Sequence, residues 1–225
     1  MTALSVAHAS NDLVRLGFDH APGSEQWRDD GRARSQWINS GAVTVTTAAA
    51  AHGVAGLSLP AASAFLYTPL TEFNAVRSGL WFIRGKFTPF TTFASRYIAG
   101  VEDAGGTAAG SSWFFYHDAS RRPYLFYSDG VTRASINGAT SLTSGTTYDW
   151  HTESTGTNLY LHIDGTVVAS VAFSGTLALP AAGQIRIGQT LAGNGPDALY
   201  ADCFQMGRRA VYGGSNFTPA TGFIQ

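Results

Sequence analysis

Cysteine is almost absent from this chain of 225 residues, in which Cys203 is the only one. A single cysteine excludes an intrachain disulfide and excludes a metal site built from the cysteines of one chain. Cys203 lies in the alternating run of residues 199–206. There we expect a small buried hydrophobic residue, and a reactive thiol is the less favoured alternative.

Charge is also scarce, since 13% of the residues are charged, the formal net charge is −1 and the isoelectric point is about 6.6. Such a chain has no electrostatic footprint for nucleic acid or for an anionic membrane, so we predict neither as a partner. No apolar run reaches the ~18 residues of a membrane-spanning helix, which predicts no membrane insertion. Residues 1–8 lack a basic region followed by an apolar run, so we expect no secretory signal and synthesis in a cytosol.

Glycine and aromatic residues are abundant, with 26 glycines and 12% aromatics, a composition that suits many strands joined by tight turns. The clearest example is residues 159–173, which read as two alternating strands that reverse at Asp164-Gly165. The first strand places His162 opposite its apolar face, and the second continues that apolar face from Val167. We therefore predict a hairpin with one face on a core and the other face in solvent.

Similar strands recur about every 10 to 15 residues, without amphipathic helices between them. They cover residues 13–18, 42–47, 56–59, 65–69, 80–87, 97–101, 112–117, 122–127, 131–136, 147–152, 184–188 and 199–206. A second Asp-Gly hairpin is expected at Asp129-Gly130, residues 19–40 are expected to form a long ordered loop, and the alanine run at 48–51 fits a short helix or a turn equally well. The pattern predicts an all-β protein with a two-sheet antiparallel β-sandwich. We expect one domain over residues 13–225, preceded by an N-terminal arm at 1–12.

Several short motifs follow one another along residues 13–224. They are Leu-Gly-Phe-Asp-His at 16–20, Pro-Gly-Ser at 22–24, Gly-Val-Ala-Gly-Leu-Ser-Leu at 53–59, Tyr-Thr-Pro at 67–69, Asp-Trp-His at 149–151, Leu-Tyr-Leu-His-Ile-Asp-Gly at 159–165, Ile-Arg-Ile-Gly at 185–188 and the segment 212–219. In this order they resemble the laminin-G-like branch of the concanavalin A-like lectin/glucanase superfamily, in the form common among bacteriophage structural proteins. One departure is Leu-Tyr-Ala-Asp at 199–202, where such domains carry a glycine and then Ile-Asp. The resemblance implies a curved jelly-roll sandwich whose relatives bind glycans, bind proteins or serve as virion architecture.

Because that superfamily includes glucanases, the acidic residues need a test for catalysis. Retaining glycosidases need two carboxylates about 5 Å apart on one face. The chain has four glutamates, and none forms a Glu-x-Asp-x-x-Glu arrangement, so we predict no catalytic residues and no enzyme activity. Asp29-Asp30 fits solvated loop acids better than a calcium site, and we interpret His151 and His162 as surface or hydrogen-bonded sheet residues. We accordingly expect no metal and no cofactor.

Aromatic residues give the one positive indication of binding. Near the middle of the chain, aromatic, acidic and basic side chains gather on two predicted strands and the turn between them, as in a platform where sugar rings stack. The residues of this platform are Trp113, Tyr116, Asp118, Arg121, Arg122, Tyr124 and Tyr127. The competing interpretation is that alternate members fill the core, and a protein partner would use the same outward residues.

These observations lead to one main functional hypothesis. We expect a non-enzymatic phage virion structural protein, a decoration or adsorption component of the capsid or tail, with a lectin-like sandwich. Its expected partners are other virion proteins, in a homo-oligomer or symmetric assembly, and host cell-surface glycans are its candidate ligands. The alternatives are a free carbohydrate-binding module and, less favoured, a glycoside hydrolase.

Overall fold

A computed structural model describes residues 12–17, 28–29, 37–51, 55–60, 63–69, 77–90, 96–102, 107–181, 183–189 and 198–220. The regular structure in these ranges is β-strand, apart from one 3-10 turn, η1 (Thr47–Ala49). Thr46 caps this turn, because its Oγ1 accepts a hydrogen bond from Ala48 N–H over 3.3 Å. No helix in the described part of the chain has the length and apolarity that a membrane span requires. The expected arm at 1–12 lies outside these ranges, except for Asp12, which begins the first strand.

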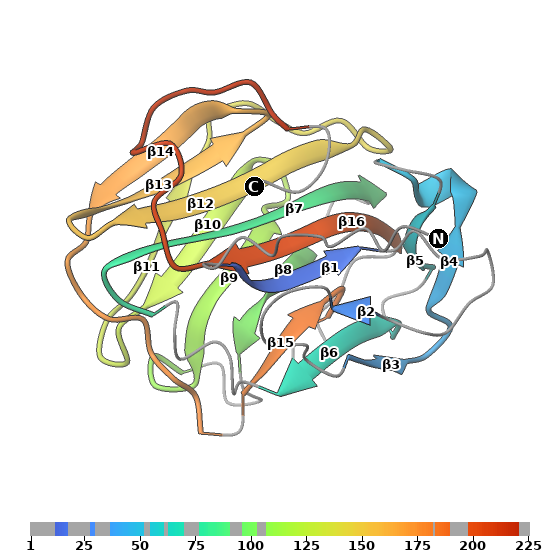
Figure 1. Cartoon of the computed structure of the whole chain (residues 1–225), viewed down its shortest axis with the longest axis horizontal. Helices are drawn as coiled ribbons and strands as arrows, with labels where there is room; N and C mark the ends of the chain where they lie inside the picture. The colour runs from blue at the N-terminus through green and yellow to red at the C-terminus, as the bar shows by residue number, and fades with distance from the viewer. Residues whose placement is uncertain are drawn as a thin grey trace, which may run out of the picture.

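The front layer in Figure 1 is a sheet to which nine of the described strands belong. Its order is β14-β13-β12-β7-β16-β1-β2, and β5 also pairs with β16 while β4 pairs with β5. The strands are β1 (Asp12–Gly17), β2 (Arg28–Asp29), β4 (Thr44–Thr46), β5 (Gly56–Leu59), β7 (Leu80–Phe90), β12 (Tyr148–Thr155), β13 (Asn158–Ile163), β14 (Thr166–Ala172) and β16 (Ala198–Gly207). We call this layer the nine-stranded sheet.

The rear layer is a sheet of seven described strands in the order β11-β10-β9-β8-β15-β6-β3. The strands are β3 (Ile38–Ser40), β6 (Phe65–Pro69), β8 (Arg96–Glu102), β9 (Ser111–His117), β10 (Pro123–Ser128), β11 (Arg133–Asn137) and β15 (Gln184–Ile187). The described strand pairs are antiparallel in both layers, which confirms the predicted all-β sandwich. The sequence missed β2 and β3, which have two and three residues and lie inside the expected loop at 19–40.

The core lies between the inner faces of the two sheets, where aromatic rings from both layers meet. Phe115 of β9 contacts Trp150 of β12 with ring centroids 5.5 Å apart and Phe87 of β7 at 6.4 Å, and all three side chains are fully buried. Burying such large apolar side chains is the main stabilising contribution to a sandwich of this kind. Cys203 is also buried, and this burial raises the pKa of its thiol, which confirms the expected hydrophobic role.

The β13–β14 hairpin confirms the predicted Asp-Gly turn, because Asp164 and Gly165 adopt φ values of 50° and 75°. The placement of Val167 on the apolar face was wrong. The pairing shifts between Leu161 and His162, so His162 lies opposite Val167 and the next residue, Val168, packs against the core. A bulge of this kind adds one residue to one strand and reverses the alternation beyond it.

The second predicted hairpin, β10–β11, forms with a longer connection than an Asp-Gly turn. Ser128 pairs with Arg133, and the four residues between them are held by Asp129. Its Oδ1 accepts hydrogen bonds from the backbone N–H groups of Val131 and Thr132 over 2.9 and 2.7 Å. The carboxylate therefore closes the turn, and the expected two-residue geometry was wrong.

Residues 208–220, which follow β16, form a strap across the outer face of the nine-stranded sheet, where Figure 1 shows them crossing β12 and β13. Val167 N–H donates to Asn216 Oδ1 and Phe217 N–H donates to Gly165 O, each over 2.8 Å. Residues 217–220 of the strap lie against this sheet through the Phe217–Gly165 hydrogen bond, while 221–225 lie outside the described residues. The strap also corrects part of the predicted hairpin, because it buries His162, whereas Ser170 and Ala172 of β14 are exposed as predicted.

The Gly165 contact generates a stability prediction. A Cβ at Gly165 would collide with the carbonyl oxygen of Phe217, whereas one at Gly156, which has φ of 85°, would meet open space. We expect Gly156→Ala to lower the free energy of unfolding by about 1–2 kcal/mol, because alanine has a Cβ that disfavours the left-handed backbone conformation of this position. Gly165→Ala should cost about 2 kcal/mol more, because the strap must also shift. Urea denaturation measures both, and equal losses would contradict the close contact.

Candidate functional site

Tyr116 and Tyr124 lie side by side on the outer face of the seven-stranded sheet. They are register partners on β9 and β10, their rings stack with centroids 4.7 Å apart, and both side chains are half-buried. Burial raises the pKa of Tyr116, so its hydroxyl stays neutral near pH 7. The structure thus brings together two members of the predicted platform as a pair of aromatic faces with polar tips.

Trp113 and Tyr127 do not belong to this outer face, so the predicted platform was wrong for both. They pair with each other on β9 and β10 but point inward, where Trp113 is fully buried and Tyr127 packs against the core and Phe173. The reason is alternation along a strand, because each lies an odd number of residues from Tyr116 or Tyr124. The competing interpretation, that alternate members fill the core, holds for these two residues.

The turn between β9 and β10 holds the remaining predicted residues in a fixed arrangement. Asp118 accepts hydrogen bonds from the backbone N–H of Arg122 over 2.8 Å and from its Nε over 2.7 Å. Burial alone would raise the pKa of Asp118, but the N–H groups and the charge of Arg122 outweigh it and leave that pKa below its ordinary value. Arg121, at φ of 62°, helps to hold this turn through its backbone. Its N–H donates a hydrogen bond to Asp118 O, and its carbonyl oxygen accepts one from Leu142 N–H.

This turn places the Arg122 guanidinium beside the tyrosine pair. Arg122 Nη2 donates to Tyr124 Oη over 3.3 Å, and its Cζ lies 5.9 Å from the Tyr124 ring centroid. The outer face therefore combines stacked rings with a held cation, an arrangement able to stack a flat ligand and hydrogen-bond its edge.

Further aromatic residues, which the sequence interpretation missed, extend this face. Phe114 and Phe126 stack at 4.3 Å directly beside the tyrosine pair, and the Arg133 guanidinium lies 4.6 Å from the Phe126 ring centroid. Farther along the sheet, the Arg186 guanidinium lies 4.3 Å from the Phe65 ring centroid. The two-residue spacing from Tyr116 and Tyr124 would have revealed both phenylalanines, whereas Phe65 and Arg186 come together only through long-range strand pairing.

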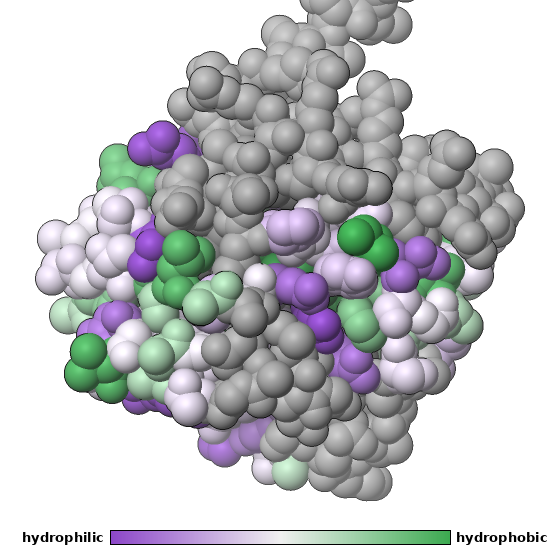
Figure 2. Space-filling view, turned by 90° about the horizontal axis from the view of Figure 1, so that it is seen from below, coloured by the Kyte–Doolittle hydropathy of each residue, from purple (hydrophilic) through white to green (hydrophobic). Residues whose placement is uncertain are grey.

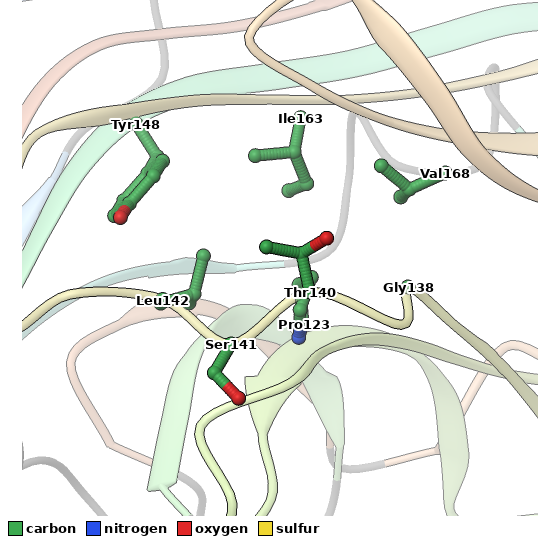
Figure 3. A pocket seen from close by; sticks show the side chains of 8 residues that line it. All are labelled: Pro123, Gly138, Thr140, Ser141, Leu142, Tyr148, Ile163 and Val168. Atoms are coloured by element: carbon green, nitrogen blue, oxygen red, sulfur yellow. The ribbon is translucent and has the colours of Figure 1, made fainter.

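A small cavity lies close to the same turn, between the two sheets (Figure 3). Tyr148, Ile163 and Val168 face Leu142 and Thr140 across it, and its volume is about 90 Å³. Sites for drug-sized ligands usually enclose about 300–1,000 Å³, so this cavity is too small to hold one.

The surface seen from the lower side of the molecule is mixed in character. Figure 2 shows the hydrophobic side chains of its described residues as separate spots among hydrophilic ones. Single apolar residues on a surface are ordinary, and binding through rings with polar tips needs no continuous apolar patch.

Two acids share one face of β12, at a spacing that the Glu-x-Asp-x-x-Glu arrangement does not include. Asp149 and Glu153 are four residues apart and both buried. Arg84 Nε donates to Asp149 Oδ1 over 2.9 Å, and Lys86 Nζ lies 3.5 Å from Asp149 Oδ2. The strap supplies the partners of Glu153, since Val211 and Tyr212 N–H donate to its Oε2 over 2.7 and 3.0 Å, and Gly214 N–H donates to its Oε1 over 2.6 Å.

These contacts make both carboxylates structural anions. Burial alone would raise the pKa of Glu153, but His151 and the strap amides lower it to about 2. A catalytic acid needs the opposite shift, toward neutrality, so Glu153 is unsuited to donate a proton to a leaving group. Glu25 and Glu72 lie outside the described residues, as does Asp30 of the calcium alternative.

The interpretation of His151 and His162 as surface or hydrogen-bonded residues was wrong. Both side chains are fully buried under the strap, and their ring nitrogens have no hydrogen-bond partner among the described residues. Within the same ranges, no three His, Cys, Asp or Glu side chains form a group that could hold a metal ion.

The inward and outward members of the predicted platform should differ in their effect on stability. Trp113→Ala removes a fully buried side chain and should cost about 3–5 kcal/mol, because it leaves a cavity between the sheets. Tyr124→Ala removes a half-buried cross-strand partner and should cost about 1 kcal/mol or less. Chemical denaturation measures both values, and similar losses would contradict the division between core and outer face.

The fold is similar to that of clostridial toxin binding domains. The receptor-binding domain of botulinum neurotoxin C/D mosaic serotype superposes with a TM-score of 0.68 at 11% identity, covering 90% of this chain and 49% of that chain. The serotype D ligand-binding domain, solved in complex with N-acetylneuraminic acid, gives 0.69 at 10% identity, with 91% and 49% covered. The binding domain of Paraclostridial mosquitocidal protein 1 gives 0.67 at 14% identity, with 90% and 50% covered.

These similarities concern the fold alone, since the identities are low and this chain spans about half the length of those domains. No protein family and no curated protein matches the sequence. The chain is thus a β-sandwich of the kind found in these receptor-binding domains.

Proposed function

We propose that this chain is a non-enzymatic binding domain that recognises a glycan on the outer face of its seven-stranded sheet. The observation that carries the proposal is the stacked pair of Tyr116 and Tyr124, with the Arg122 guanidinium held beside it by Asp118. Pyranose rings have apolar faces that pack on aromatic rings, and their hydroxyls accept hydrogen bonds from guanidinium groups. The Asp118 contacts fix Arg122 in advance, which lowers the entropic cost of binding.

The similar structures support this choice of ligand class. They are receptor-binding domains, and one of them was solved with N-acetylneuraminic acid, an acidic sugar. Because this chain matches about half of each, their ligands need not bind the half that it resembles. Sialylated glycans are nevertheless the first ligands to test, since a guanidinium pairs well with a carboxylate.

Two other functions use the same structure. A protein partner would also use outward aromatics and arginines, and a free carbohydrate-binding module would bind glycans without belonging to a larger particle. A glycoside hydrolase is the weakest alternative, because Asp149 and Glu153 are engaged by Arg84 and by the strap amides. Within the proposal, residues 13–225 form one domain, and 1–12 an arm.

The glycan proposal predicts that Tyr116→Ala and Tyr124→Ala each weaken binding about fivefold or more, since stacking on one ring contributes on the order of 1 kcal/mol. The measurement is a glycan array that includes sialylated and neutral bacterial and plant glycans, followed by titration calorimetry on any ligand found. Tyr200→Ala is the matched control, because Tyr200 is a half-buried tyrosine on the nine-stranded sheet that contacts Phe90.

Equal affinity of the wild type and both tyrosine variants would refute the site, and a folded protein silent across the array would refute glycan binding. Release of reducing ends from any bound polysaccharide would refute the non-enzymatic proposal.

We further propose that the chain is a structural component of a bacteriophage virion, decorating the capsid or tail and contacting other virion proteins in a homo-oligomeric or symmetric assembly. Its support is the order of sequence motifs along residues 13–224. Mass spectrometry of purified particles should detect the chain at a fixed ratio to the main capsid or tail protein, and imaging should place it on the surface. Its absence from purified particles, with presence in the surrounding lysate, would favour a free module.

A further inference from the structure

The pair of histidines under the strap is the most unusual feature of the buried interior. His151 of β12 and His162 of β13 are register partners, with ring centroids 5.1 Å apart and interplanar angle 73°. Neither side chain is exposed, and all four ring nitrogens are without a hydrogen-bond partner in the described structure. The nearest carboxylate oxygen, Oε2 of Glu153, lies 3.6 Å from His151 Nε2, beyond hydrogen-bond distance.

Aromatic rings enclose this pair. The strap supplies Tyr212 and Phe217, which stack at 3.5 Å and form the roof, while Phe82 of β7 stacks on His151 at 5.9 Å. The Phe217 ring centroid lies 5.4 Å from that of His151 and 5.2 Å from that of His162. An apolar enclosure of this kind favours neutral imidazole over imidazolium.

The carboxylate next to the pair is that of Glu153, 3.6 Å from His151 Nε2, and it already accepts hydrogen bonds from three strap amides. The ionisable groups whose rings or charges reach the pair are Arg84 of β7, Asp149 and Glu153 of β12, Tyr160 of β13 and Tyr212 of the strap. Asp149 pairs with Arg84 and Lys86, and Asp202 accepts hydrogen bonds from the N–H groups of Ala51 and Cys203. Glu153 is engaged by three amides of the strap.

Protonation would therefore act on the strap in two ways. An imidazolium on His162 or His151 is a buried cation under an aromatic roof, which costs free energy as long as the roof stays closed. A protonated His151 also attracts Glu153 Oε2, and it then competes for that oxygen with the N–H groups of Val211 and Tyr212. Both effects favour the open strap.

We propose that residues 208–220 are an acid-released cover, which leaves the outer face of the nine-stranded sheet when His151 and His162 are protonated while the two sheets stay assembled. This device is independent of the glycan site, which lies on the other sheet. Release would uncover Phe82, Tyr212 and Phe217 together with the charged groups beneath them, so that a new surface forms only under acidic conditions.

The direction of the pH dependence follows from the histidines. Burial lowers the pKa of His162 to about 4 and also lowers the pKa of His151, whereas a histidine freed by opening has a pKa of about 6.5. The open form thus binds more protons between these values, and the ratio of closed to open strap falls as the pH falls from about 6.5 toward 4. The fall is at most about tenfold per pH unit for each histidine.

Hydrogen exchange read by NMR tests the proposal on the whole chain between pH 7 and pH 5. The reporters are the amides of Val211, Tyr212, Gly214 and Phe217, and the reference amides are those of β9 and β10. After correction for the intrinsic effect of pH, protection of the reporters should fall at least about tenfold while that of the reference amides stays constant. The double variant His151→Phe with His162→Phe keeps aromatic rings under the strap but cannot be protonated there. Protection of its reporter amides should therefore change less than about twofold between pH 7 and pH 5.

Three outcomes would overturn the proposal. They are reporter protection that does not change with pH, an equal fall in the double variant, and loss of the β9 and β10 amides at the same midpoint, which indicates global unfolding. If the double variant does not fold, titration of the histidine ring protons in the wild type replaces it. The strap amides must then shift with the midpoint of His151 or His162, and a different midpoint overturns the proposal.

Discussion

The interaction on which the rest of the arrangement depends is the one between the Glu153 carboxylate and three backbone amides of the strap. Glu153 is fully buried, and a buried carboxylate is tolerated only when hydrogen bonds replace its lost water. Side chains alternate along β12, so Trp150 fills the core while Asp149 and Glu153 project to the opposite face. The strap must therefore lie across β12, and the centre of this sheet is buried on both sides.

This constraint gives the two sheets different outer faces. On the nine-stranded sheet, the strap encloses the charges of Arg84, Asp149 and Glu153, which are satisfied inside the protein and are unavailable to a ligand. On the seven-stranded sheet, the half-buried Tyr116 and Tyr124 present ring faces and hydroxyls. A ligand could bind the face under the strap only after the strap is released, whereas binding to the tyrosine pair requires no rearrangement. The second is therefore the basis of the proposed function.

Local chemistry explains which parts of the fold could be predicted from the sequence. Asp164-Gly165 specifies its turn within two residues, and alternation identifies strands such as β5 (Gly56–Leu59) and β6 (Phe65–Pro69) with their observed bounds. Val167 was misplaced because a bulge depends on the pairing of two strands. Strands as short as β2 carry too few residues for a periodic signal.

The candidate site divides in the same way. Tyr116 and Tyr124 could be placed on one face because β9 and β10 form a hairpin whose alternation is legible in the sequence. The inclusion of Trp113 and Tyr127 ignored that alternation, and strict application of it would have excluded them. The burial of His151 and His162 could not be predicted, because the rings that cover them, Tyr212 and Phe217, come from a segment about fifty residues away in sequence.

The strap-covered face of the nine-stranded sheet and the tyrosine face of the seven-stranded sheet lie on opposite sides of the core, and that core determines whether one face affects the other. Trp150 stands between Asp149 and His151 on β12, and its ring contacts that of Phe115, which stands between Phe114 and Tyr116 on β9. Coupling through such a contact requires an element with two discrete arrangements. Both rings are fully buried, and close packing leaves buried side chains little room to rearrange. We therefore expect loss of the strap to change what lies outside β12 without moving Phe115. The proposed release of the strap would then change one outer surface with acidity and leave the other surface constant.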